Sequence, residues 1–199
     1  MREDIAQYMH VSVLHLLLAG CLAAHGALLG CANLRPHAVT VGEVQAPVQW
    51  GAAKNVRRLR HLWIADQPDA AGFETAKRAG VKVVIDLREP GEREWDEAAA
   101  VRSLGLEYYN VPVARKAPFS RDAFGEIEGL LQAHHGEQIL VHCSSGNRAA
   151  GWLSTHLVDA HHMSLDSALE VGKRAGITTD AIVEKVVIYV GSTAPNGVK

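Results

Sequence analysis

The chain has 199 residues, with 20 Lys and Arg against 22 Asp and Glu and a formal net charge of −2. This length suits one domain with its own hydrophobic core, once any targeting segment is set aside. The balanced charge argues against the strongly basic face of a nucleic-acid binder, so we expect no nucleic-acid partner and a small or peptide-sized substrate.

Residues 1–32 are expected to be a targeting or anchoring segment, because residues 11–30 are almost continuously apolar. Cys21 and Cys31 each follow a small residue, as in the lipobox of bacterial lipoproteins, and either is a candidate for acylation. We therefore expect export to the periplasmic face with membrane anchoring through a lipid. A retained membrane anchor, cleaved secretion and an over-extended gene start remain alternatives. In each case Cys143 is the only thiol of the folded domain, which then has no internal disulfide.

After an expected linker at 33–54, strand and helix patterns alternate through a catalytic domain at 55–199. Strands are expected at 56–65, 81–87, 106–113 and 139–142, and helices from Asp69 to Lys77, at 97–104, after Ser120, at 148–160, at 164–175 and from Thr178 or Thr179. The run "VVIYV" at 186–190 would suit a strand equally well. This alternation predicts an α/β fold with a mostly parallel central sheet flanked by helices, and a ligand site at the carboxyl ends of the strands.

The segment "HCSSGNR", residues 142–148, begins where a buried strand is expected to end. A loop that enters a helix here can turn its backbone N–H groups inward and add the positive end of the helix. An anion would be held there, and the same field would stabilise a thiolate at Cys143, the candidate nucleophile. Gly146 permits a positive φ, and Arg148 offers a planar fork for two anionic oxygens. The candidate substrate-binding residues are therefore Ser144, Ser145, Gly146, Asn147 and Arg148.

The same segment resembles the active-site motif of cysteine-dependent phosphatases, in which His-Cys begins a loop that Arg closes. The stretches "HLWIADQPDAAGFETAKRAGVKVVIDLREPGE" and "DEAAAVRSLGLEYYNVPV" resemble the phosphatase-like domain of beta-lactamase hydrolase-like proteins. That family is related to dual-specificity phosphatases, and its members are also labelled sulfurtransferases. The resemblance covers about residues 55–177 and implies a phosphatase-type fold, a phosphate monoester substrate, a cysteinyl-phosphate intermediate and no metal or organic cofactor. It implies that His142 holds the loop and tunes the thiol.

Two departures from this pattern keep other functions open. Four residues separate Cys143 from Arg148, one fewer than in tyrosine and dual-specificity phosphatases, and Ala149 stands where phosphatases usually have Ser or Thr. The shorter loop and "IDLREPGE" at 85–92 resemble rhodanese sulfurtransferases, in which the cysteine carries a persulfide. A sulfurtransferase is therefore the first alternative, and a non-catalytic domain that binds anions is the second.

The general acid is the least defined part of the site. A phosphatase of this type uses an Asp in the loop after the "NVPV" strand, and Asp122 is the only carboxylate in residues 114–122. Asp122 would equally suit the first turn of a helix capped by Ser120. Asp86 and Arg88 suit a buried structural ion pair, although Asp86 could also reach the site.

The sequence has 11 His, but their spacing predicts no metal site. His134-His135 and His161-His162 are adjacent pairs near helix ends, and neighbours on a helix point in different directions. No Cys or carboxylate cluster accompanies them. The oligomeric state is left open by the sequence.

Overall fold

The computed structural model describes residues 42–192. The expected targeting segment, with Cys21 and Cys31, therefore lies outside the described residues. No helix within 42–192 is long and apolar enough to cross a membrane.

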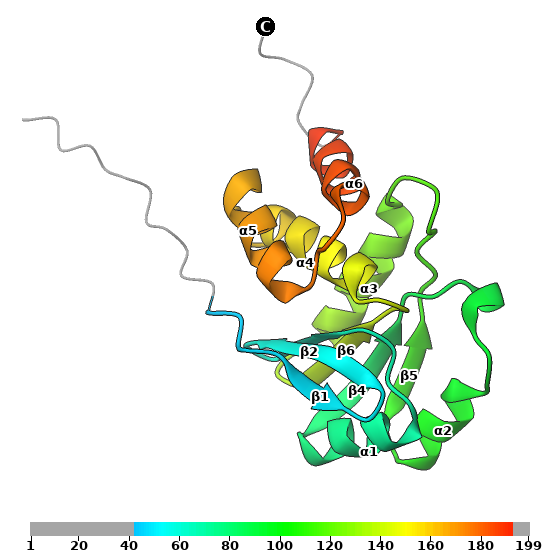
Figure 1. The fold of residues 1–199 in the computed structure, drawn as a ribbon. Coiled ribbons are helices and arrows are strands. Elements are labelled where there is room, and N and C mark those ends of the chain that lie inside the picture. The colour runs from blue at the N-terminus through cyan, green and yellow to red at the C-terminus, as the bar shows by residue number, and fades with distance from the viewer. Residues whose placement is uncertain (1–41, 193–199) are drawn as a thin grey trace, which may run out of the picture. The chain divides into compact units, whose positions relative to one another are not determined.

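A six-stranded sheet in the order β1-β2-β3-β6-β4-β5 forms the centre of the domain (Figure 1). Its strands are β1 Val48–Trp50, β2 Ala53–Leu59, β3 Leu62–Ala65, β4 Val81–Asp86, β5 Glu107–Asn110 and β6 Gln138–His142. The pairs β3–β6, β6–β4 and β4–β5 are parallel, which confirms a parallel core. The pairs β1–β2 and β2–β3 are antiparallel, so the whole sheet is mixed.

The antiparallel edge corrects two expectations from the sequence. The single strand expected at 56–65 is a hairpin, which turns at Arg60 with a positive φ of 58°. No Gly, Pro or Asn marks this turn, so the apolar pattern runs through it unbroken. The expected linker at 33–54 contains β1 and the start of β2, so this part of it belongs to the fold. Trp50 of β1 is buried, and its ring centroid lies 4.6 Å from that of Trp63.

Helices cover both faces of the sheet (Figure 1). They are α1 Ala70–Arg78, α2 Glu97–Ser103, α3 Arg121–Ala133, α4 Asn147–Asp159, α5 Leu165–Ala175 and α6 Asp180–Gly191. The helices α1 and α2 lie on one face, and α3 to α6 lie on the other. Ser120 and Ser164 cap α3 and α5, because each hydroxyl accepts a hydrogen bond from a first-turn backbone N–H.

The "VVIYV" run belongs to α6 and is not a strand. Val186 and Tyr189 are buried, three positions apart, while Val187 and Ile188 between them are exposed. This spacing is helical, and the buried pair packs on the same core cluster as α4.

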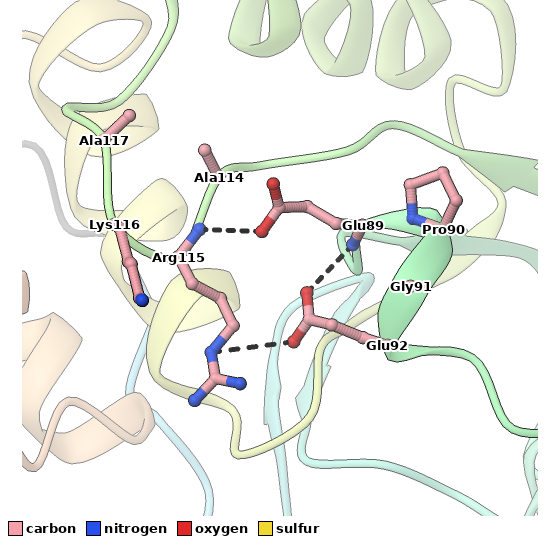
Figure 2. A pocket seen from close by; sticks show the side chains of 8 residues that line it. All are labelled: Glu89, Pro90, Gly91, Glu92, Ala114, Arg115, Lys116 and Ala117. Carbon is pink, nitrogen blue, oxygen red and sulfur yellow. Dashed lines mark hydrogen bonds and ion pairs between the residues drawn. The ribbon is translucent and has the colours of Figure 1, made fainter.

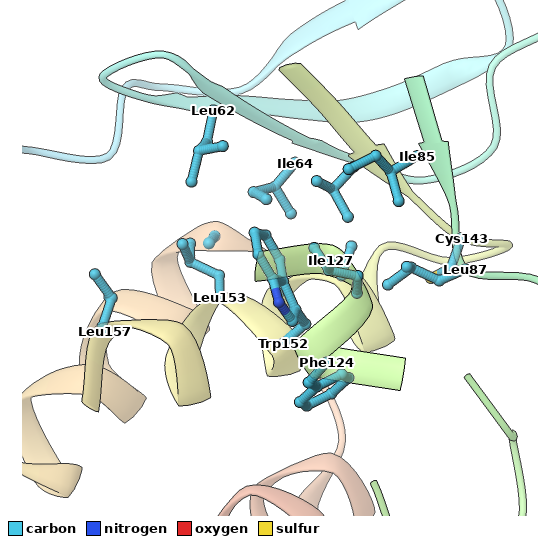
Figure 3. Close-up of a cluster of buried hydrophobic side chains, with 14 of the residues drawn as sticks. Leu62, Ile64, Ile85, Leu87, Phe124, Ile127, Cys143, Trp152, Leu153 and Leu157 are labelled. Atoms are coloured by element: carbon cyan, nitrogen blue, oxygen red, sulfur yellow. The ribbon is translucent and has the colours of Figure 1, made fainter. Parts of the chain in front are cut away.

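The larger core cluster fills the space between the sheet and α3 to α6. Trp152, Leu153 and Ile127 are fully buried at its centre, and Cys143 lies at its edge by Leu87 (Figure 3). The thiol is therefore held in place by the packed side of the sheet, at the end of a central strand.

Candidate active site

The loop from Cys143 to Gly146 joins the end of β6 to the start of α4. Its backbone is held on both sides, since the N–H of Cys143 donates to the carbonyl of Ala65 at 3.4 Å and the carbonyl of His142 accepts from Leu87 at 2.9 Å. Gly146 is the N-cap of α4 with a φ of 82°, the left-handed conformation expected from the sequence. Cys143 is only 1% exposed, so its sulfur lies at the floor of the loop.

The backbone amides of this loop are free to bind an anion. Among the described residues, Ser144, Ser145 and Gly146 donate no hydrogen bond from their backbone N–H groups. Gly146 makes no side-chain cap, so the first-turn amides of α4 also lack a capping acceptor. Unpartnered amides and an uncapped helix N-terminus next to Cys143 are the features that the predicted anion cradle needs, and the cradle itself stays a prediction.

Arg148 is buried in the first turn of α4, and its guanidinium is fixed from several directions. Nη1 donates to the carbonyls of Val113 at 2.8 Å and Leu87 at 3.2 Å. Nη1 and Nη2 also donate to the two carboxylate oxygens of Glu92, each at 2.7 Å. Burial by itself would lower the pKa of Arg148, but the hydrogen bonds to Glu92 and the interaction with Cys143 raise it.

Glu92 is a site residue that the sequence reasoning missed. It ends a short turn of 3-10 helix, Pro90–Glu92, and accepts the Ser144 hydroxyl at 2.9 Å besides both Arg148 nitrogens. Burial would raise its pKa, but the hydrogen bonds from Arg148 and its other partners lower the pKa to about 2. Glu92 is therefore ionised at neutral pH and cannot serve as a general acid. It occupies one edge of the guanidinium, and Nη2 also donates to the Ser144 hydroxyl at 3.1 Å.

A second group of buried polar side chains lies behind Cys143. His142 is fully buried, and its Nε2 lies 3.0 Å from Oε1 of Glu97, which the sequence reasoning also missed. The other Glu97 oxygen accepts from Arg88 at 2.7 Å, and Arg88 also binds both oxygens of Asp86 at 2.9 Å. The expected Asp86–Arg88 ion pair is thus confirmed, and both residues are buried. Burial would raise the pKa of Asp86, but Arg88 lowers it.

Asp86, Glu97 and His142 bring three possible metal ligands within 4.8 Å of one another. The guanidinium of Arg88 bridges the two carboxylates, and the Tyr108 hydroxyl donates at 2.8 Å to Oδ2 of Asp86, which Arg88 also binds. Arg88 supplies there the positive charge that a metal ion would bring, so the donor set suits an ion-pair network better than a metal.

The remaining candidate site residues differ in their exposure to solvent and in their contacts. The side chain of Asn147 is engaged by Thr178 and is not available to a ligand of the loop. Its Nδ2 donates to the Thr178 hydroxyl at 3.0 Å, and its Oδ1 accepts from the Thr178 backbone N–H at 2.8 Å. Ser145 is exposed beside it. Asp122 is exposed in the first turn of α3, and it is not among the residues that line the pockets beside the loop.

Among the pockets near the loop, two adjoin each other at Arg115. The larger, about 870 Å³, lies between Pro90–Glu92 and residues 114–117 (Figure 2). Arg115 crosses between these walls: its backbone N–H donates to Glu89 at 3.1 Å, and its Nε lies 3.8 Å from Glu92. The smaller, about 230 Å³, has Ser144, Ser145, Asn147 and Arg148 on one side and residues of α6 on the other.

No protein-family model matches the sequence, and a search of curated proteins finds no match. Solved structures do match the fold. A putative phosphatase (DUF442) from Shewanella putrefaciens is 19% identical, with a TM-score of 0.53 over 75% of this chain and 91% of that one. A cysteine-to-serine variant of Pseudomonas aeruginosa TpbA, in complex with phosphotyrosine, is 17% identical, with a TM-score of 0.60 over 81% and 93%.

Kinase-associated phosphatase, with its catalytic cysteine replaced by serine, is 16% identical, with a TM-score of 0.58 over 68% of this chain and 89% of that one. These relatives are phosphatases, and they do not support the finer labels of beta-lactamase hydrolase-like protein or sulfurtransferase. At such identities the likeness shows the fold, and the chain has the α/β fold of tyrosine and dual-specificity-type phosphatases.

Proposed function

We propose that the protein is a cysteine-dependent phosphatase that hydrolyses phosphate monoesters with Cys143 as its nucleophile. One observation carries the proposal: the buried Cys143 begins a loop of unpartnered backbone amides, and the Arg148 that closes this loop is oriented by a carboxylate. The fold shared with known phosphatases agrees with it.

In the first step the Cys143 thiolate attacks phosphorus, so an S–P bond forms while the ester P–O bond breaks. The loop amides and the guanidinium of Arg148 stabilise the equatorial oxygens as charge develops on them. The leaving oxygen takes a proton from a general acid, for which Asp122 remains the candidate from the sequence. In the second step water attacks phosphorus, and the S–P bond breaks to release inorganic phosphate and the thiolate.

The roles of the surrounding residues follow from their contacts. Glu92 is a positioning residue, because it holds two nitrogens of Arg148 and the Ser144 hydroxyl at once. His142 and Glu97 support the end of β6, from which the loop starts. No step in this proposal needs a metal or an organic cofactor.

The test is aryl phosphate hydrolysis by the wild type and by Cys143→Ser. We expect phosphate release by the wild type and a loss of about a thousandfold or more in the variant. Equal rates in the two proteins would overturn the assignment of the nucleophile.

A sulfurtransferase is the second candidate, favoured by the spacer of four residues and by Ala149. In that reaction the Cys143 thiolate takes a sulfane sulfur from thiosulfate, releases sulfite and passes the sulfur to cyanide. The same two proteins are therefore assayed for thiocyanate formation. Cysteine-dependent thiocyanate formation without phosphate release would replace the phosphatase proposal, and activity in neither assay would favour the domain that only binds anions.

A further inference from the structure

The smaller pocket beside the loop is larger than one phosphoryl group requires. Its volume of about 230 Å³ is roughly eight times the ~30 Å³ that a water occupies in the liquid. Arg148 and Ser144 stand on the side of the nucleophile, while Thr179, Ile182 and Lys185 stand on the side of α6. A substrate phosphate on the loop would therefore leave the α6 side of the pocket unfilled.

The lining of this pocket carries an excess of positive charge. Three of its residues are cationic, namely Arg115, Arg148 and Lys185, and none of its lining residues is an Asp or a Glu. Glu92 is already engaged by Arg148 at 2.7 Å, whereas Arg115 lies 3.8 Å from it and is largely exposed. The carboxylate of Glu92 thus neutralises most of the charge of Arg148. Within the described part of the chain, the charges of Arg115 and Lys185 have no carboxylate partner as close as this one.

Lys185 is held at the pocket with an incomplete set of partners. Its ammonium donates to the carbonyls of Ala114 at 3.2 Å and Arg115 at 2.7 Å, which leaves one of its three N–H donors. Burial and the nearby charge of Arg148 lower its pKa, although Glu89 opposes them. A second anion in the pocket would relieve this repulsion and accept the remaining N–H.

The backbone adds to the same field. Thr179 is the N-cap of α6 and makes no side-chain cap, so the N-termini of α4 and α6 both open without a capping side chain beside one pocket. Asp180 lies in the first turn of α6 but outside the lining.

From this arrangement we infer that the α6 side of the pocket binds a second anionic group of the substrate, with Lys185 and Arg115 as its cations. The inference rests on the proposed phosphatase function and narrows its substrate class to phosphate monoesters that carry a second phosphate or a carboxylate. Arg148 binds the reacting phosphate, and Lys185 and Arg115 determine specificity.

The test uses two probes of the same size, 3-carboxyphenyl phosphate and its neutral amide, 3-carbamoylphenyl phosphate. Calorimetry measures the binding of both probes to Cys143→Ser, and steady-state kinetics give kcat and KM for the hydrolysis of each probe by the wild-type protein. We expect the carboxylate to bind about fivefold to tenfold more tightly than the amide, with the difference appearing in KM. Equal binding of the two probes would overturn the inference.

Lys185→Met and Arg115→Gln should each reduce this preference, while Lys116→Gln should preserve it. Lys116 is the matched control because it is a cation in the same loop but does not line this pocket. Arg115 is exposed, so its replacement does not threaten folding. A preference that survives in both variants, or an equal weakening of both probes, would contradict the roles assigned to these cations.

The second anion could belong to an acidic peptide or to a small molecule. Phosphotyrosyl peptides with Asp or Asn beside the phosphotyrosine distinguish these two sources. A preference for Asp that depends on Lys185 would identify an acidic peptide, and its absence beside a clear preference for 3-carboxyphenyl phosphate would identify a small molecule. Binding does not require turnover, so the two proposals fail separately. If the protein releases no phosphate but still binds the carboxylate probe more tightly than the amide, only the phosphatase proposal is wrong. If it releases phosphate but binds the two probes equally, only the second anion site is wrong.

Discussion

Glu92 connects three parts of the site through one carboxylate. It binds Arg148 through two hydrogen bonds of 2.7 Å and accepts the Ser144 hydroxyl at 2.9 Å. Arg148 is only 5% exposed, so loss of this partner would leave a poorly hydrated charge. We therefore expect Glu92 to affect activity by orienting Arg148, without contacting the substrate.

Glu92→Gln should change stability in a way that depends on pH. The folded-state pKa is lowered from 4.5 to about 2, so the ionised form stabilises the fold above pH 4.5 and this contribution is lost as the pH falls towards 2. We expect the variant to lose about 2 kcal/mol of unfolding free energy at neutral pH. The difference should shrink as the pH falls through that window in urea titrations.

The control is Glu126→Gln, which removes an exposed carboxylate of α3. It should leave the unfolding free energy within about 0.5 kcal/mol of the wild type. A deficit in Glu92→Gln that stays constant from pH 7 to about pH 2 would show that the carboxylate acts through packing and not through its charge.

At the scale of elements, the site is a strand, a loop and a helix that meet at Gly146. Cys143 directly follows β6, Arg148 lies in α4, and the turn between them has a φ of 82° at Gly146. A Cβ there would lie 3.4 Å from the backbone nitrogen of Asp66, so space is adequate and the conformation is the obstacle. A left-handed residue at such a position is typical of loops whose amides converge on an anion.

Gly146→Ala should therefore destabilise the protein by about 1–2 kcal/mol and reduce phosphate release. Gly125→Ala is the matched control: Gly125 lies inside α3, is exposed, and would place its Cβ in open space. We expect that control to be neutral or more stable by up to about 1 kcal/mol, with unchanged activity. Thermal unfolding and aryl phosphate hydrolysis measure both effects, and equal behaviour of the two variants would refute the conformational argument.

At the scale of the whole molecule, the edge strand β1 belongs to the folded domain. Trp50 of β1 is 4% exposed and packs in the smaller core cluster with Phe73 and Val84. Gly72 of α1 lies so close to β1 that a Cβ would come within 2.6 Å of the Trp50 carbonyl oxygen. The strand β1 thus covers α1 as well as the edge of the sheet.

A protein that begins at residue 55 should consequently be less stable than one that begins at residue 42. Loss of Trp50 and its neighbours removes apolar burial comparable to a large-to-small core substitution, about 3–5 kcal/mol. Urea unfolding of the two proteins measures the difference. Equal midpoints would show that β1 is dispensable and would restore the expected linker.

Local patterns were sufficient for much of the fold and for the centre of the site. The apolar run at 81–87, the Ser120 and Ser164 caps and the helical spacing of α3 each depend on neighbours in the chain. The hairpin at Arg60 was missed because a non-glycine residue adopts the left-handed turn.

Cys143, Gly146 and Arg148 were found from the sequence because the chemistry of an anion cradle fits within one short loop. Glu92 and Glu97 were not, since each contacts its partner from far along the chain: Arg148 lies 56 residues after Glu92, and nothing local distinguishes either carboxylate from a solvated one. The sequence determined the candidate nucleophile and the loop to which it belongs. Only the tertiary structure decided which carboxylates orient that loop and which cations face it, because those contacts arise when separate strand ends and helix starts meet at one edge of the sheet.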